Sequence, residues 1–247
     1  MKNYISLMKL RVVELLLVTT VPALFLASNG VPDLSVTFWS LLRGGTFAAG
    51  GANAFNMVIE AKSDLLMKRT AKRPIATGEI SRRSGLIFAT AISLLSLVMF
   101  YLFTTKLAAL LTFLAIAFYV FGYTIALKKH TSQNIVWGGI AGCMPVLIGQ
   151  AAVSNSLTLT SWLFFFLIFF WTPPHFWALA VRYREDYAAA GIPMLPVVAP
   201  IKNVITQMWF HSLAMVVFSI LVIWSAELPI WLAGLTLILI VGWKKQL

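Results

Sequence analysis

The chain has 247 residues, of which 60% are hydrophobic and only 11% are charged, and its net charge is +11. So few charged residues exclude an ordinary soluble domain and indicate a membrane protein with several spans. The single cysteine, Cys143, excludes an internal disulfide framework and a metal site built from clustered cysteines.

Apolar runs of roughly membrane-spanning length follow one another along most of the chain. The eight runs lie near residues 10–28, 35–59, 84–104, 107–126, 134–153, 160–180, 204–224 and 228–243. We therefore predict an all-α, polytopic membrane bundle of about eight transmembrane helices, which forms a single domain over the whole chain.

The basic residues gather on one side of this predicted bundle. Of the 19 Lys and Arg residues, 17 lie near the N-terminus, after the second, fourth and sixth runs, or in the C-terminal tail. Because Lys and Arg are enriched in cytoplasmic loops, both termini and all the basic loops are predicted to be cytoplasmic. The positive charge thus reports membrane topology, and we expect the lipid bilayer, not nucleic acid, as its surroundings.

A stripe of polar residues ends the second apolar run. Asn56, Glu60 and Asp64 recur every four residues, so they share one face of a helix, and Asn53 extends that face by one turn. Oxygen ligands at this spacing suit Mg²⁺, which commonly binds through carboxylates and substrate phosphates. Four basic residues follow directly, and they are Lys68, Arg69, Lys72 and Arg73. The layout predicts a diphosphate site, whereas an ordinary basic helix end explains the cations but not the polar groups in an apolar helix.

A second polar segment closes the sixth run. Pro173 and Pro174 predict that this helix bends or breaks, and His175 follows at once. His175 is a candidate iron ligand or general base, with a hydrogen-bonded structural histidine as the alternative. Glu185 and Asp186 are a candidate second group of metal ligands, with a surface salt bridge to a neighbouring arginine as the competing interpretation.

Three sequence blocks resemble the UbiA superfamily of intramembrane prenyltransferases, and within it the protohaem IX farnesyltransferase (haem O synthase) branch. The blocks are NMVIEAKSDLLMKRTAKRPIATGEI, YTIALKKHTSQNIVWGGIAG and PPHFWALAVRYREDYAAAGIPMLPVV. The resemblance runs from about Leu10 to Val198 and keeps the order and spacing of the blocks. The RT-x-x-RP and DY-x-x-AG-x-PMLPVV patterns are specific to that branch.

This resemblance implies a helical bundle around a central cavity open to the bilayer, in a bacterial plasma membrane. It implies transfer of the farnesyl group of farnesyl diphosphate to a vinyl group of haem b, assisted by Mg²⁺, to give haem O and diphosphate. Haem b is then a substrate and not a cofactor. A complex with a haem A synthase is compatible with this role, although no residue pattern encodes one. The family usually has nine spans, so we expect that the last helix is absent or that the sequence is shortened.

Residue type and spacing suggest some of the candidate site residues, and the resemblance assigns the others by position, namely Asn56, Glu60, Asp64, Lys68, Arg69, Arg73, His175, Asp186 and Tyr187. The candidate catalytic residues are Asn56, Glu60, Asp64, Lys68, Arg69, Arg73 and Asp186, and the candidate metal ligands are Asn56, Glu60, Asp64, Glu185 and Asp186. The candidate substrate-binding residues are Asn53, Tyr123, Lys128, Lys129, His175, Arg182, Arg184 and Tyr187. Glu60 stands where the family usually has Asp, which keeps the charge but lengthens the side chain. Lys128 and Lys129 are also explained by membrane topology alone.

Two other functions fit parts of the sequence. A prenyltransferase with an aromatic, quinone-precursor acceptor shares the first motif, but the DY-x-x-AG-x-PMLP block argues against it. A non-catalytic carrier of haem or isoprenoid also suits broken helices and polar groups at membrane depth. Such a carrier needs no Mg²⁺ and releases no diphosphate.

Overall fold

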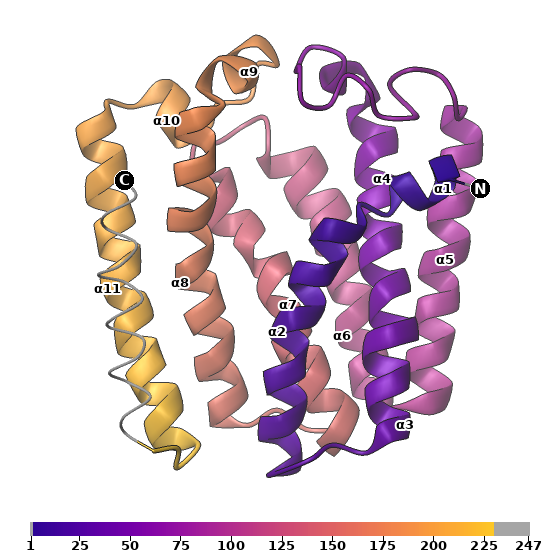
Figure 1. Ribbon diagram of the computed structural model, residues 1–247, viewed down its shortest axis with the longest axis vertical. Helices are drawn as coiled ribbons and strands as arrows, with labels where there is room; N and C mark the ends of the chain where they lie inside the picture. Colours follow the sequence, from indigo (N-terminus) through magenta and orange to yellow (C-terminus); the bar gives the residue numbers. More distant parts are fainter. Residues whose placement is uncertain (1, 230–247) are drawn as a thin grey trace.

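The computed structural model describes residues 2–229, and every regular element in that part is a helix. The elements are α1 (Lys2–Leu7), α2 (Leu10–Ser28), α3 (Leu34–Thr37), η1 (Phe38–Gly45), α4 (Thr46–Asp64), α5 (Arg82–Phe103), α6 (Lys106–Ala117), η2 (Phe118–Leu127), α7 (Asn134–Ser154), α8 (Leu159–Arg182), α9 (Arg184–Ala189), α10 (Leu195–Val198) and α11 (Ile201–Ser225). The long helices stand side by side, with α9 and α10 over one end of α8 and α11, and with α1 beside α4 and α5 toward the same end of the bundle (Figure 1). The predicted all-α membrane bundle is confirmed.

Six helical segments are long and apolar enough to cross a membrane. They are Leu10–Ser28, Arg82–Phe103, Lys106–Leu127, Asn134–Ser154, Leu159–Arg182 and Ile201–Ser225. The second predicted run forms the continuous stretch α3–η1–α4, whose last part carries the polar stripe. The run predicted near 228–243 falls almost entirely outside the described residues. The protein is therefore an integral membrane protein.

Hydroxyl side chains cap the first turns of α5, α6 and α8. Thr105 caps α6 by accepting the backbone N–H of Ala108, and Ser81 caps α5 in the same way. At the start of α8, Thr158 and Ser161 form a reciprocal capping box. Such caps satisfy backbone donors that have no partner inside the helix, so each helix begins at a defined residue.

The helix α8 runs through Pro173 and Pro174 without interruption, so of the two predicted effects a break does not occur, and a bend stays a prediction. Proline removes one backbone donor, but both prolines are buried against neighbouring helices, which hold the segment in place. The preceding Thr172 donates its hydroxyl to the carbonyl of Ile168 at 2.8 Å.

Two π-helical segments interrupt otherwise α-helical spans. Directly after η1 the hydroxyl of Thr46 donates to the carbonyl of Leu41 at 3.1 Å, and in η2 that of Thr124 donates to the carbonyl of Tyr119 at 2.9 Å. In both cases the acceptor lies five residues back, which is the spacing of a π-helix. Such segments are frequent at functional sites, and both contribute residues to the cavity described below.

The loop after α4 packs against the segment after α8. Met67 lies in one buried apolar cluster with Trp177, Tyr187 and Ile192. Because these residues are far apart in sequence, the cluster brings the two predicted polar segments to the same end of the bundle. The ring of Tyr183 reinforces this contact, as described with the site.

Candidate active site

A cavity of about 330 Å³ opens between α2, α4, η2, α7 and α8. Its charged lining residues in the described part of the chain are Lys9, Glu60, Arg69, Arg73 and Lys128. Four cations thus surround one carboxylate, and all of them lie at the end of the bundle where the basic loops gather. A cavity end with this excess of positive charge suits an anionic ligand that carries several oxygen atoms.

The polar stripe of α4 is buried at this end, as its four-residue spacing predicted. Asn53, Asn56, Glu60 and Asp64 are each between 1% and 4% exposed. Asn53 donates its amide to the carbonyl of Met8 at 3.0 Å, which ties α4 to the chain just before α2. Buried polar groups at this depth need partners, and the other three find theirs in cations.

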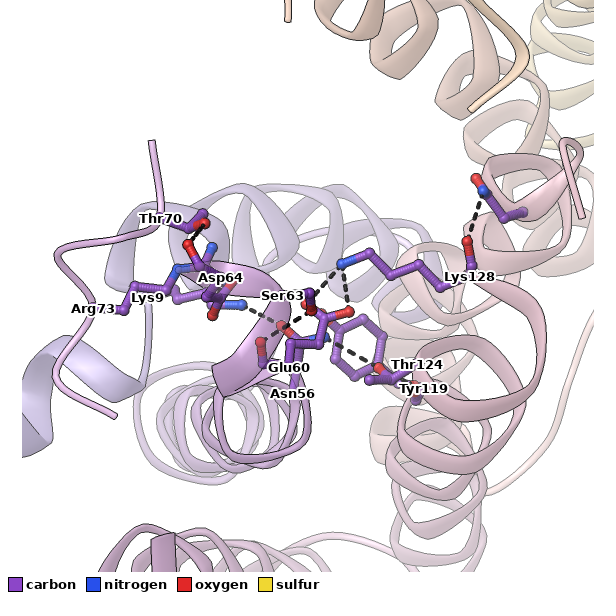
Figure 2. Close-up of polar contacts among 11 residues, drawn as sticks. Lys9, Asn56, Glu60, Ser63, Asp64, Thr70, Arg73, Tyr119, Thr124 and Lys128 are labelled. Atoms are coloured by element: carbon purple, nitrogen blue, oxygen red, sulfur yellow. Dashed lines mark hydrogen bonds and ion pairs between the residues drawn. The ribbon is translucent and has the colours of Figure 1, made fainter. Parts of the chain in front are cut away.

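Two ion pairs hold the carboxylates of the stripe. Lys128 donates from its ammonium to Oε2 of Glu60 at 2.7 Å, reaching across from the end of η2 (Figure 2). Arg73 donates from Nη1 to both oxygens of Asp64 at 2.7 and 2.8 Å. Each carboxylate of the stripe therefore has one charge-assisted hydrogen-bond partner that reaches it from another segment.

The third member of the stripe, Asn56, is oriented by a chain of hydrogen bonds. Lys9 donates to its Oδ1 at 2.6 Å, and its amide nitrogen donates to the hydroxyl of Thr124 at 3.3 Å. The hydroxyl of Thr124 in turn donates to the carbonyl of Tyr119 at 2.9 Å. Since Thr124 donates to the backbone, its lone pairs face Asn56, and the amide oxygen of Asn56 must point toward the cations (Figure 2).

Lys9 reaches the site through an unusual backbone conformation. It lies between α1 and α2 with φ 52° and ψ 60°, in the left-handed region that few non-glycine residues adopt. Burial lowers the pKa of Lys9 from 10.5 to about 7, and the positive charges of Arg73 and Lys128 act in the same direction. The negative charge of Glu60 opposes that shift. The ammonium is held in a crowded cationic environment, where a polyanion would stabilise its charged form.

The donor set fits Mg²⁺. The second oxygen of Glu60, Oε1, is buried and accepts no hydrogen bond, although the ammonium of Lys128 lies 2.5 Å away. Asp64 and Asn56 add oxygen atoms on the same face of α4, and oxygen is the ligand type that Mg²⁺ prefers. Within residues 2–229 no three His, Cys, Asp or Glu side chains group closely enough to hold a metal by themselves. The fit is therefore that of a magnesium ion bound through one or two carboxylates together with substrate phosphates.

The second acidic pair is not part of this group. Glu185 is exposed and Asp186 is half-buried on α9, and neither forms an ion pair among the described residues. The adjacent Tyr187 is buried and lines the cavity, and burial raises its pKa above 10. The arginines nearby make other contacts. Arg184 donates to the carbonyl of Val197 at 3.5 Å, and Arg182 lies over the ring of Tyr183.

The structure divides the predicted site residues into two sets. Those that line the cavity are Asn53, Asn56, Glu60, Arg69, Arg73, Tyr123, Lys128 and Tyr187. Those that do not line it are Asp64, Lys68, Lys129, His175, Arg182, Arg184, Glu185 and Asp186. Asp64 belongs to the site through Arg73, and Arg182 approaches it indirectly, because Arg69 and Arg182 both lie 5.8 Å from the ring of Tyr183. Lys68 and Lys129 are exposed.

The aromatic part of the cavity lies on α8 and η2. Trp171, Phe176 and Tyr123 line it, so all three offer ring faces to a ligand beside the charged end. His175 is exposed on the outside of α8 and stacks on Trp171, with ring centroids 4.4 Å apart. The structure therefore places His175 behind the aromatic wall and not on it.

Sequence reasoning missed Lys9 and Thr124. Lys9 was counted only as a topological charge, and nothing in its spacing connects it to α4. Thr124 lies in a recognised block, but its role depends on the π-helical turn that frees the carbonyl of Tyr119. Neither signal is visible as a linear pattern.

The comparisons with known proteins agree with this geometry. A sequence model of the UbiA prenyltransferase family matches residues 16–247. The chain belongs to the UbiA prenyltransferase family. Protoheme IX farnesyltransferase 1 of Saccharopolyspora erythraea is 50% identical over 220 residues, which cover 89% of this chain and 70% of that protein. Protoheme IX farnesyltransferase of Kineococcus radiotolerans is 47% identical over 246 residues, which cover 98% of this chain and 71% of that protein.

Solved structures of this family share the fold. A UbiA homologue from Archaeoglobus fulgidus, bound to GPP and Mg²⁺, has a TM-score of 0.77 and 19% identity, covering 97% of this chain and 84% of that one. The apo structure of a UbiA homologue from Aeropyrum pernix K1 has a TM-score of 0.74 and 20% identity, covering 89% of this chain and 80% of that one. At this identity the likeness establishes the UbiA fold and no more.

Proposed function

We propose that this UbiA-family protein transfers the farnesyl group of farnesyl diphosphate to a vinyl group of haem b, giving haem O and diphosphate. The observation that carries the proposal is the cavity whose charged end holds four cations around a carboxylate stripe and whose remaining wall is mostly apolar. Such a cavity matches a prenyl diphosphate, which is a polyanion joined to a long hydrocarbon. The choice of haem b as acceptor rests on relatives about 50% identical that are named protoheme IX farnesyltransferase.

Mg²⁺ is the metal that the proposal requires. Asn56, Glu60 and Asp64 would hold it, and when bound it neutralises diphosphate oxygens and makes diphosphate a better leaving group. The solved Archaeoglobus fulgidus homologue was bound to GPP and Mg²⁺, which supports this choice of ion. Asp186 and Glu185 remain candidate ligands from the sequence motif.

The protein's own cations take part in the same step. Lys9, Lys128 and Arg73 each already contact an oxygen of the stripe, so each is within reach of a diphosphate bound there. As the C–O bond to the farnesyl group breaks, these cations stabilise the charge that builds on the diphosphate. They are fixed before the reaction, so little reorganisation is needed when that charge appears.

The aromatic wall receives the other product of bond cleavage. The allylic cation at the first carbon of the farnesyl chain lies next to Trp171, Tyr123 and Phe176, whose ring faces attract positive charge. The terminal carbon of the haem vinyl group forms a bond to this carbon, which moves the positive charge to the vinyl carbon next to the porphyrin. Water adds there and loses a proton to solvent, which leaves a hydroxyl group. The apolar cavity keeps water from the farnesyl cation before this bond forms.

The cavity also offers a route for the acceptor. Val12 and Leu15 of α2 line it and are exposed on the outer surface of the described residues. An apolar macrocycle dissolved in the bilayer can approach the cavity from that side.

We further propose that the protein forms one domain in a bacterial plasma membrane, with both termini and the basic loops in the cytoplasm, as the distribution of Lys and Arg predicts.

The test uses membranes that contain the full chain. Haem b and farnesyl diphosphate are added with and without Mg²⁺, and the products are separated by chromatography and identified by mass. A Mg²⁺-dependent peak with the mass of haem O is expected. Diphosphate release with an aromatic acid but not with haem b would instead identify a quinone-type acceptor, and binding without diphosphate release would identify a carrier.

A further inference from the structure

We propose that Phe100 closes the cavity at its far end and thereby sets the length of the prenyl chain that the protein accepts. The inference rests on the proposed function in one respect, which is that the anionic head of a prenyl diphosphate binds at the charged end. Phe100 lies near the end of α5, on the side of the bundle opposite the basic loops. It makes no contact with the charged residues, so it has no place in the chemistry described above.

The cavity is long and its direction is fixed. The wall that α4 contributes between Glu60 and Gly45 is about 22 Å long, judged from the rise of an α-helix. The charged residues are confined to one end of that wall. A prenyl chain attached to a diphosphate at Glu60 must therefore extend along the cavity toward Gly45 and η1.

The far end is closed by buried side chains. Phe100 is 1% exposed, and Thr20, Ser40 and Thr112, which also line the cavity, are buried as well. Each of these three hydroxyls donates to a carbonyl of its own helix, at distances between 2.5 and 3.1 Å. With their polar atoms satisfied, these side chains present mainly methyl and methylene surface, so the end of the cavity is apolar and shut.

Phe100 occupies a special position in this end wall. It is the one residue of α5 that lines the cavity in the described part of the chain, because its ring passes between η1 and α6. Gly44 makes room for it, since a Cβ atom at that position would lie 2.8 Å from Cε2 of Phe100. On its other side the ring packs in a buried cluster with Ala108, Cys143 and Leu147. The ring thus separates the cavity from a close-packed core.

Shortening this side chain should lengthen the cavity. The phenyl ring that Phe100→Ala removes is similar in size to one five-carbon isoprene unit, so the space it leaves can receive the last unit of a geranylgeranyl chain. A single methylene in an apolar pocket changes specificity by about tenfold or more. We therefore expect the ratio of geranylgeranyl to farnesyl transfer to rise by at least about tenfold in Phe100→Ala and by a smaller factor in Phe100→Leu.

The experiment compares wild type, Phe100→Ala, Phe100→Leu and the control Phe103→Ala. Phe103 lies three residues further along α5, is exposed, and stacks on Trp39 outside the cavity. Each protein receives haem b, Mg²⁺ and an equal mixture of farnesyl and geranylgeranyl diphosphate, and the two haem products are quantified by mass. A higher ratio of geranylgeranyl to farnesyl product in both Phe100 variants, together with a wild-type ratio in the Phe103→Ala control, supports the assignment.

Protection against thermal unfolding by each diphosphate gives the same comparison without any acceptor. This second readout separates the two proposals. If wild type is protected by farnesyl diphosphate but does not modify haem b, haem b is not the acceptor. The role of Phe100 is then still tested by comparing the protection that geranylgeranyl and farnesyl diphosphate give to wild type and to the Phe100 variants. An unchanged preference in a folded Phe100→Ala protein overturns the inference. If that variant does not fold, an unchanged preference in Phe100→Leu overturns it as well.

Discussion

Replacing Lys128 by methionine should destabilise the protein, because it leaves the carboxylate of Glu60 buried without its cation. Glu60 is 4% exposed and the Lys128 side chain is 14% exposed. Removing one partner of a buried ion pair costs about 3–5 kcal/mol. Since the pair borders a cavity, where rearranged water can partly solvate the carboxylate, we take the lower end, about 3 kcal/mol, as the expected loss in the free energy of unfolding.

The assay is reversible unfolding in mixed micelles with increasing denaturing detergent, which gives the free energy of unfolding of each variant. Lys129→Met is the matched control, because Lys129 is the next residue and its side chain is exposed. Its effect should stay within about 0.5 kcal/mol. The double variant Lys128→Met with Glu60→Gln should recover most of the loss, since the unpaired charge is gone. Equal stabilities of Lys128→Met and Lys129→Met would refute the argument that Glu60 needs this cation.

Three further outcomes follow from the same site. Asp64→Ala should abolish haem farnesylation. The variant should remain folded, because the side chain of Arg73 is 19% exposed and can be solvated by water once its partner is gone. Near-normal turnover in the folded variant would contradict a metal role for Asp64. Thr124→Val should raise the Mg²⁺ concentration needed for half-maximal activity by about tenfold, since Asn56 loses its acceptor, and Thr124→Ser should not. Because burial lowers the pKa of Lys9 from 10.5 to about 7, the unfolded chain binds more protons between these values, so stability should rise with pH across that window. Unfolding midpoints at pH 7 and about pH 10 should show a smaller rise in Lys9→Met than in wild type.

The helical pattern and the polar stripe were readable from the sequence because both are periodic. Asn56, Glu60 and Asp64 recur at the spacing of a helix face, and α4 buries all three. Periodicity does not say which loops approach that face, however. Lys128 reaches Glu60 from 68 residues away, and Lys9 reaches Asn56 from 47 residues away. Those contacts depend on how the helices pack, which no local pattern encodes.

The helix α8 continues through its two prolines for a related reason. Pro173 and Pro174 are helix breakers in an isolated segment, but α8 is enclosed by α7 and α11, and packing decides its path. Asp186 matches an acidic motif by position and stays a candidate ligand, and α9 leaves it half-buried, with no ion pair among the described residues. Helix propensity and motif position each describe one segment of the chain at a time, whereas the cavity of the site is formed by five helical segments.

The π-helical turn of η2 controls the angular phase of everything that follows it in that span. The wide turn accommodates one residue more than an α-helical turn does, and successive residues of an α-helix are rotated by about 100°. An α-helical path with the same number of residues would therefore swing Lys128 by about that angle around the helix axis, and its ammonium would face a different neighbour. A one-residue deletion between Phe118 and Tyr123 that also removes the wide turn would instead leave Lys128 at about its present angle. In a homologous chain of the same length that keeps Lys128 but lacks the π-helical turn, the lysine would be present but would point away from the carboxylate.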